Sequence, residues 1–212
     1  MTSALAIAAL GFFLGMRHAT DADHVIAVTT IVARHRSVRS AAWIGALWGL
    51  GHTLTILVVG GAIILFGWVI PPRVGLSMEL SVGLMLVALG IMNLTGTWQG
   101  IQGALGLTQL VRPLVVGIVH GLAGSAAVAL LVLAALQSTS WSLLYLLVFG
   151  VGTIAGMMLF TAGISIPFAL SGRQFTRLNR SLRIASGALS LGFGLFLAYQ
   201  VGVVHGLFTG QV

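Results

Sequence analysis

Long apolar segments dominate this sequence and limit the folds open to it. Short polar or arginine-containing stretches separate six of them: 3–33, 42–70, 80–94, 113–136, 141–170 and 184–207. A helix needs about 20 residues to cross a hydrocarbon core of ~30 Å, so five are long enough and the third needs helical flanks. The first is long enough to tilt, break or project from the membrane. We therefore expect an all-α integral membrane protein with about six transmembrane helices.

Composition supports that fold class. Only 6% of the residues are charged and 58% are hydrophobic, whereas about a quarter of a soluble domain is charged. The net charge is +7 and every basic residue is an arginine. Because these arginines lie mostly in short connections, membrane topology explains them better than nucleic acid does. We expect the lipid bilayer as a partner and no nucleic acid.

Arginine placement predicts the orientation. Eight arginines fall in the connections 34–39, 98–112 and 171–183, whereas the opposite connections hold only Arg73. Because positively charged loops favour the cytoplasm, the three arginine-rich connections should face inward. The chain should then be a multi-pass protein of the cytoplasmic (inner) membrane, with both termini outside.

The sequence also contains an internal repeat. Segments of the second half match segments of the first in the same order, at offsets of 101 to 104 residues. The matches are Gly15-Met16-Arg17-His18 with Gly117-Ile118-Val119-His120, Gly49-Leu50-Gly51-His52 with Gly150-Val151-Gly152-Thr153, and Gly83 and Gly90 with Gly187 and Gly194. Chance similarity among glycine-rich apolar segments is the alternative, since small residues are common where membrane helices pack.

The repeat predicts one domain built from two halves. Residues 1–212 would form a single transmembrane domain, with repeat 1 at about 1–97, repeat 2 at about 113–212 and a cytoplasmic connection at about 98–112. Three crossings per repeat would give the halves opposite orientations. This 3+3 inverted plan is typical of secondary transporters, which bind substrate between the repeats near the middle of the membrane.

One polar motif interrupts the first apolar segment. It reads Arg17-His18-Ala19-Thr20-Asp21-Ala22-Asp23-His24. Ionisable groups within an apolar span are costly, about 2.5–3.5 kcal/mol each, so they usually mark function. On an unbroken helix His18, Asp21 and His24 would share an arc of about 120°. Asp23 would point elsewhere, so either it orients a ligand imidazole or the helix is distorted there.

Imidazoles with a carboxylate suit divalent first-row metals such as Ni²⁺, Co²⁺, Zn²⁺, Cu²⁺ and Fe²⁺. His52, beside Gly49 and Gly51, could add a third imidazole from another helix. His120 corresponds to His18 in the repeat but lacks the following acids, so a ligand and a packing histidine both stay open. A polar network that merely joins helices is the alternative for the whole motif. The candidate metal ligands are His18, Asp21, Asp23, His24, His52 and His120; no catalytic residue and no resident cofactor are expected.

These motifs resemble those of the nickel/cobalt transporter family. His18 to His24 is similar to its His-x4-Asp-His signature, and Leu50-Gly51-His52-Thr53 to its Leu-Gly-His-Ser/Thr motif. Larger members have eight helices and further acid-bearing motifs, whereas this chain has no acid after Glu79. It therefore resembles the short six-helix branch that includes urease-accessory-type nickel permeases. The resemblance implies a non-enzymatic importer of Ni²⁺, or of Co²⁺, across the cytoplasmic membrane.

Residue chemistry is compatible with secondary transport. Inward movement of a dication gains about 4.6 kcal/mol per 100 mV, and metal uptake should fall at acid pH because imidazoles bind metal only when deprotonated. The chain has no lysine, so it contains no Walker-type nucleotide-binding site. A metal exporter of the same fold, a membrane metalloenzyme and a non-transporting assembly partner stay open as alternatives, as does a homo-oligomer.

Overall fold

The computed structural model describes residues 2–33, 37–68, 70–97, 111–123, 138–174 and 176–209. All regular elements in these ranges are helical, which confirms the all-α fold class for this part of the chain. They are α1 (Thr2–His18), α2 (Ala22–Val32), α3 (Val38–Phe66), α4 (Pro72–Thr95), α6 (Val111–Leu122), α8 (Thr139–Gln174), α9 (Thr176–Tyr199) and the π-helical turn η1 (Gln200–Val204).

Four of these helices are long and apolar enough to cross a membrane. They correspond to α3, to α4, to residues Thr139–Leu170 of α8 and to Arg177–Val204, which joins α9 to η1. Helices α1, α2 and α6 are shorter apolar helices. The chain is therefore a multi-pass membrane protein.

Two predicted segment boundaries were wrong. Helix α4 begins at Pro72 rather than near residue 80, because proline is well suited to the first position of a helix. The connection expected at 171–183 is almost entirely helical, since α8 continues to Gln174 and α9 begins at Thr176. Arginine is a good helix former, so these helices continue through the arginine-rich stretch. Most of the connection at 98–112 and of the second half of segment 113–136 lies outside the described residues.

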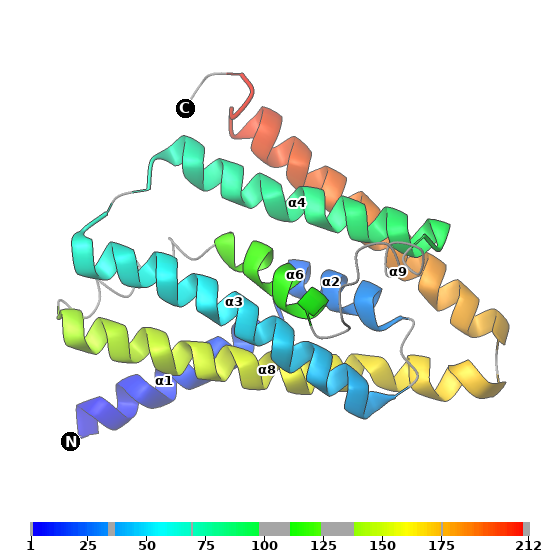
Figure 1. The fold of residues 1–212 in the computed structure, drawn as a ribbon, viewed down its shortest axis with the longest axis horizontal. Helices are drawn as coiled ribbons and strands as arrows, with labels where there is room; N and C mark the ends of the chain where they lie inside the picture. The colour runs from blue at the N-terminus through cyan, green and yellow to red at the C-terminus, as the bar shows by residue number, and fades with distance from the viewer. Residues whose placement is uncertain are drawn as a thin grey trace.

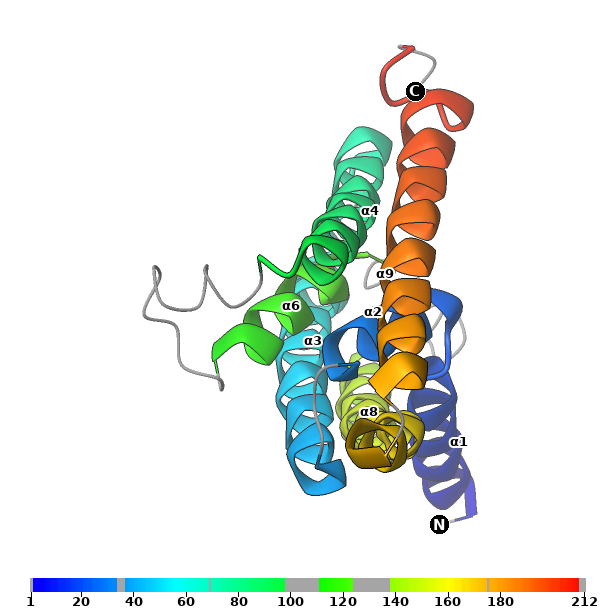
Figure 2. The ribbon, with the colours of Figure 1, turned by 90° about the vertical axis from the view of Figure 1, so that its right-hand side faces the viewer.

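The helices form two groups with short helices between them. Helices α4 and α9 pack together, and α8 packs against both α1 and α3. In both ribbon views the short helices α2 and α6 lie between these groups (Figures 1 and 2). Buried Val28, Trp48, Leu86 and Met157, from α2, α3, α4 and α8, belong to one apolar cluster that joins the groups.

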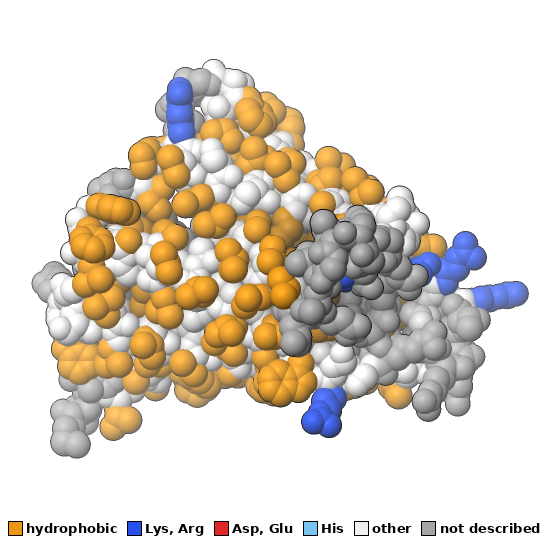
Figure 3. Space-filling view, in the orientation of Figure 1, with side chains coloured by type: hydrophobic (Ala, Val, Ile, Leu, Met, Phe, Trp, Pro, Cys, Tyr) orange, Lys and Arg blue, Asp and Glu red, His pale blue; other side chains and the backbone are white. Residues whose placement is uncertain are grey.

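Apolar side chains also cover much of the outside. Figure 3 shows a face on which they spread across the helices, while most of the visible arginines project from its margins. Leu54 and Val58 of α3 are exposed, and so is Leu159 of α8. By contrast His24, His52 and His120 are buried. An apolar surface of this kind suits contact with lipid, whereas these three histidines lie inside the helix bundle.

Candidate metal centre

The first apolar segment breaks at its polar motif. Helix α1 ends at His18 and α2 begins at Ala22. Between them, Thr20 donates a backbone hydrogen bond of 2.8 Å and a side-chain hydrogen bond of 2.6 Å to the Arg17 carbonyl. Threonine and aspartate compete with helical hydrogen bonds in this way, which explains a break here. Asp21 is the N-cap residue of α2, but its side chain makes no cap hydrogen bond.

Because of this break, the prediction of His18, Asp21 and His24 on one face of a single helix was wrong in its geometry. His18 and His24 nevertheless meet, with ring centroids 4.6 Å apart. The Asp21 carboxylate instead accepts a 2.7 Å hydrogen bond from His18 Nδ1. The turn, rather than helical periodicity, brings these side chains together.

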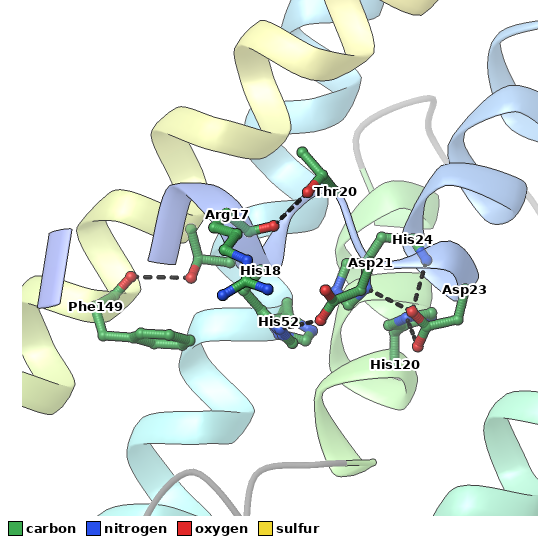
Figure 4. A network of polar contacts seen from close by, with 10 residues as sticks. Arg17, His18, Thr20, Asp21, Asp23, His24, His52, His120 and Phe149 are labelled. Carbon is green, nitrogen blue, oxygen red and sulfur yellow. Dashed lines mark hydrogen bonds and ion pairs between the residues drawn. The ribbon is translucent and has the colours of Figure 1, made fainter. Parts of the chain in front are cut away.

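His18 connects α1 with α3. Its Nε2 atom lies 3.0 Å from Nε2 of His52, so the two imidazoles share one hydrogen bond (Figure 4). His52 is fully buried, whereas the His18 side chain is 19% exposed. The side chain of Asp21, beyond His18, is 53% exposed. At this end, the cluster therefore extends from the buried imidazole of His52 to the exposed carboxylate of Asp21.

Asp23 connects α2 with α6. Its Oδ1 accepts a 3.0 Å hydrogen bond from His24 Nδ1, and its Oδ2 accepts another of 3.0 Å from His120 Nε2. Both imidazoles are buried, whereas the Asp23 side chain is 28% exposed. Asp23 thus lies at the centre of the cluster, not on a separate helix face, and His120 belongs to the cluster.

All six predicted site residues lie in this cluster. His18, His24 and His52 can each offer one ligand atom within 4.8 Å of the others, and the same holds for Asp23, His24 and His120. Asp21 contacts the cluster through His18. The structure thus brings together residues from α1, α2, α3 and α6 that the sequence had only suggested as partners.

Several buried nitrogens of the cluster have no hydrogen-bond partner in the described part of the chain. They are Nε2 of His24, Nδ1 of His52 and Nδ1 of His120. Leaving a buried polar atom unpaired costs about 1–3 kcal/mol, so such atoms are uncommon unless they have a role. Three at one place suit a cluster that receives a ligand.

Two aromatic residues pack against the cluster, and the sequence pattern singled out neither. The Trp48 ring stacks on His24 with centroids 5.8 Å apart, and the Phe149 ring lies 5.5 Å from His18. A signal for Trp48 was present, because residues four apart on a helix share a face and His52 follows it by four. Phe149 lies 101 residues after Trp48, so the repeat could have indicated it.

Close contacts between helices fix where His18 and His120 lie relative to the neighbouring long helices. A Cβ atom on Gly15 would overlap the Phe149 carbonyl oxygen, and one on Gly117 would overlap the Trp48 carbonyl oxygen. Each glycine precedes a site histidine by three residues, His18 and His120 respectively. Glycine is therefore required at both positions for α1 and α6 to approach the long helices.

Comparisons with known proteins show which family this chain resembles in sequence. The NicO model, described as "High-affinity nickel-transport protein", matches residues 4–103. The urease accessory protein UreH of Bacillus sp. (strain TB-90) is 40% identical over 218 residues, covering 96% of this chain and 95% of that protein. The "Chloroplast protein FOR GROWTH AND FERTILITY 2" of Arabidopsis thaliana is 26% identical over 92% of this chain, which spans 56% of that protein. No solved structure matches.

The match to NicO includes the segments that carry His18 to His24 and His52, and the match to UreH extends over nearly the whole chain. The resemblance found in the sequence motifs is therefore confirmed. This multi-pass membrane chain belongs to the NicO family of high-affinity nickel-transport proteins, and it is similar to UreH along almost its full length.

Proposed function

We propose that this protein is a secondary-type permease that imports Ni²⁺, with Co²⁺ as a second substrate, across the cytoplasmic membrane. The observation that carries the proposal is the convergence of four imidazoles and the Asp23 carboxylate inside an apolar bundle. Membership of a nickel-transport family supports the metal, and the similarity to an accessory protein supports a non-enzymatic role.

The donor set suits the proposed substrate. Neutral imidazoles bind Ni²⁺ and Co²⁺ well, whereas Mg²⁺ and Ca²⁺ prefer oxygen donors. Metal–nitrogen bonds of about 2.0–2.1 Å place neighbouring donors about 2.9–3.4 Å apart. The pairs His18 Nε2 with His52 Nε2 and His120 Nε2 with Asp23 Oδ2 are both separated by 3.0 Å. A cation could thus replace a hydrogen bond with little movement of the ligands.

An inverted repeat is part of the proposal, and two sets of contacts support it. Gly15 of α1 packs against Phe149 of α8, while Gly117 of α6 packs against Trp48 of α3. Gly117 follows Gly15 by 102 residues and Phe149 follows Trp48 by 101. The first helix of each half therefore packs on the long helix of the other half, as a two-fold relation between the halves requires.

The pair α4 and α9 gives the second set. A Cβ atom on Gly90 would lie 2.6 Å from Leu191 N, and one on Gly194 would lie 2.7 Å from Val87 N. Gly194 follows Gly90 by 104 residues, and Leu191 follows Val87 by the same number. The contact of Gly90 with Leu191 therefore corresponds to the contact of Gly194 with Val87 when the two halves are exchanged.

A transport cycle follows from this arrangement. Asp23, His24 and His52 come from repeat 1, whereas His120 comes from repeat 2. Movement of one repeat against the other would expose the cluster first to the outside and then to the cytoplasm. With both termini outside, inward movement of a dication would be driven by the membrane potential. The proposed cycle requires no nucleotide-binding site in this chain.

Uptake of radioactive Ni²⁺ at nanomolar concentration by cells expressing this chain tests the proposal. The matched variant is His24→Ala, expressed to the same level, and His205→Ala outside the cluster is the control. We expect uptake by the parent and the control but not by His24→Ala. Background uptake in all three, with faster loss of Ni²⁺ from preloaded parent cells, would instead assign an exporter. Background in both assays would reject transport and favour an assembly partner.

A further inference from the structure

The cluster contains two overlapping sets of donors rather than one. The first set is His18, His24 and His52; the second is Asp23, His24 and His120. Within each set the ligand atoms lie within 4.8 Å of one another. His24 is the residue that the two sets share, with its ring centroid 4.6 Å from that of His18 and 4.3 Å from that of His120.

We propose that these sets are two successive binding positions for the same metal ion, and that His24 passes the ion from one to the other. The proposal rests on the transport function proposed above and specifies its path. The first position is formed by His18, His24 and His52, and the second position by Asp23, His24 and His120. The ion keeps His24 as a ligand while it exchanges the other two.

The two positions differ in charge. Among the described residues, the first position consists of three imidazoles, and Asp21 lies outside it with a hydrogen bond to His18 Nδ1. The second position includes the Asp23 carboxylate, whose Oδ2 lies 3.0 Å from His120 Nε2. Donor sets of different charge bind an ion with different strength, so a change in the surroundings of either one shifts the ion between them.

Only one position can be filled at a time. The rings of both sets lie close together, with the His52 and His120 centroids 5.9 Å apart. Both positions use His24, and a neutral imidazole has one ring nitrogen with a free lone pair, so His24 cannot bind two ions at once. The expected stoichiometry is therefore one metal ion per chain, although two donor sets are present.

The positions also differ in which parts of the chain supply their ligands. His18 on α1, His24 on α2 and His52 on α3 all precede α4, whereas His120 lies on α6, after it. Movement of α6 relative to α2 therefore changes the second position directly, whereas it acts on the first position through the packing of α6 against His52. Each position also has one partly exposed member, His18 at 19% and Asp23 at 28%. Each position is therefore in contact with solvent through one of its own ligands.

The experiment compares metal binding with metal transport in single and double variants. Purified protein in detergent is titrated with Ni²⁺ to give stoichiometry and Kd, and the same preparations are placed in vesicles loaded with a Ni²⁺ indicator. The variants are His18→Gln, His120→Gln, the double variant of these two, and His24→Gln. The control is His205→Gln, which lies outside the cluster.

If there are two positions, the variants that lack one of them should keep Ni²⁺ binding but lose Ni²⁺ transport. His18→Gln and His120→Gln should each still bind one Ni²⁺, with Kd raised less than tenfold, because the other position stays intact. Both should lose more than nine-tenths of transport, because the path is interrupted. His24→Gln and the double variant should lose binding, with Kd raised more than a hundredfold.

A single site with all four histidines predicts a different pattern. Each single variant would then weaken binding as much as His24→Gln does, and that result would overturn the proposal. Normal transport by His120→Gln would overturn it as well, since the second position would be dispensable. If the parent neither binds nor transports Ni²⁺, the proposed function itself fails, and this outcome is distinct from the other two.

Discussion

His120 Nε2 of α6 lies 3.0 Å from Asp23 Oδ2 of α2, although 97 positions separate the two residues in the chain. Asp23 also accepts a hydrogen bond from the neighbouring His24. One carboxylate therefore fixes the orientation of two buried imidazoles that come from different halves of the sequence. Removing an orienting carboxylate of this kind typically weakens metal binding 10- to 100-fold.

The two carboxylates of the motif should consequently differ in importance. Asp23→Asn keeps the shape of the side chain but removes its charge and one of its two acceptor oxygens. We expect Ni²⁺ affinity to fall by about 10- to 100-fold, because Asp23 also orients His24, which both positions share. Asp21→Asn should have a smaller effect, because the Asp21 side chain is 53% exposed and its carboxylate hydrogen-bonds to the partly exposed His18. Titration of the two purified variants with Ni²⁺ compares them directly. Equal losses in both variants would contradict the central role of Asp23.

Trp48 should report metal binding. Its ring stacks on His24 and also contacts His120 edge-on, with centroids 5.8 and 5.5 Å away. Ni²⁺ is paramagnetic and quenches nearby indole fluorescence, so adding Ni²⁺ should lower the emission of the parent protein. Trp48→Phe should keep binding but lose most of the quenching. Trp141→Phe, a change at an exposed residue of α8, is the matched control and should keep the quenching.

The close approach of α1 to α8 should not tolerate an added methyl group. Gly15→Ala would place Cβ against the Phe149 carbonyl oxygen, and overpacking of this kind costs about 1–3 kcal/mol. Thermal unfolding in detergent should show a Tm lower by about 3–10 °C. Gly163→Ala on α8 is the control, since a Cβ atom there meets nothing within 4 Å, and its Tm should stay the same or rise slightly. An unchanged Tm for Gly15→Ala would show that α1 can move away from α8 at no cost.

The proposed orientation can be tested with single cysteines, because the chain contains none of its own. Thr209→Cys, near the C-terminus, should react with a membrane-impermeant maleimide in intact spheroplasts. Thr97→Cys, just after the end of α4, should react only after the membrane has been opened. Both residues are exposed, so access to the thiol should depend on the side of the membrane. The reverse pattern would invert the proposed topology, and with it the direction in which the membrane potential drives the ion.

The sequence by itself determined the fold class, because long apolar runs with so few charges can satisfy their backbone groups in a membrane only as helices. It also identified the six candidate ligands, since ionisable residues are rare in such runs and therefore conspicuous. The glycine spacing before His18 and His120 likewise indicated that the two residues correspond. Segment ends were less well predicted, because Pro72 and the arginines near residue 177 are compatible with helix as well as with loop.

Only the tertiary structure decided how the candidates meet. Helical periodicity placed Asp23 away from His18 and His24, because it could not anticipate that Thr20 would hydrogen-bond to Arg17 and end α1. It could not choose between ligand and packing residue for His120 either, since that depends on how α6 crosses α3 and faces α2. The contact between His120 and Asp23 arises from helix packing across nearly half the chain, and no local pattern in a sequence specifies such a distance.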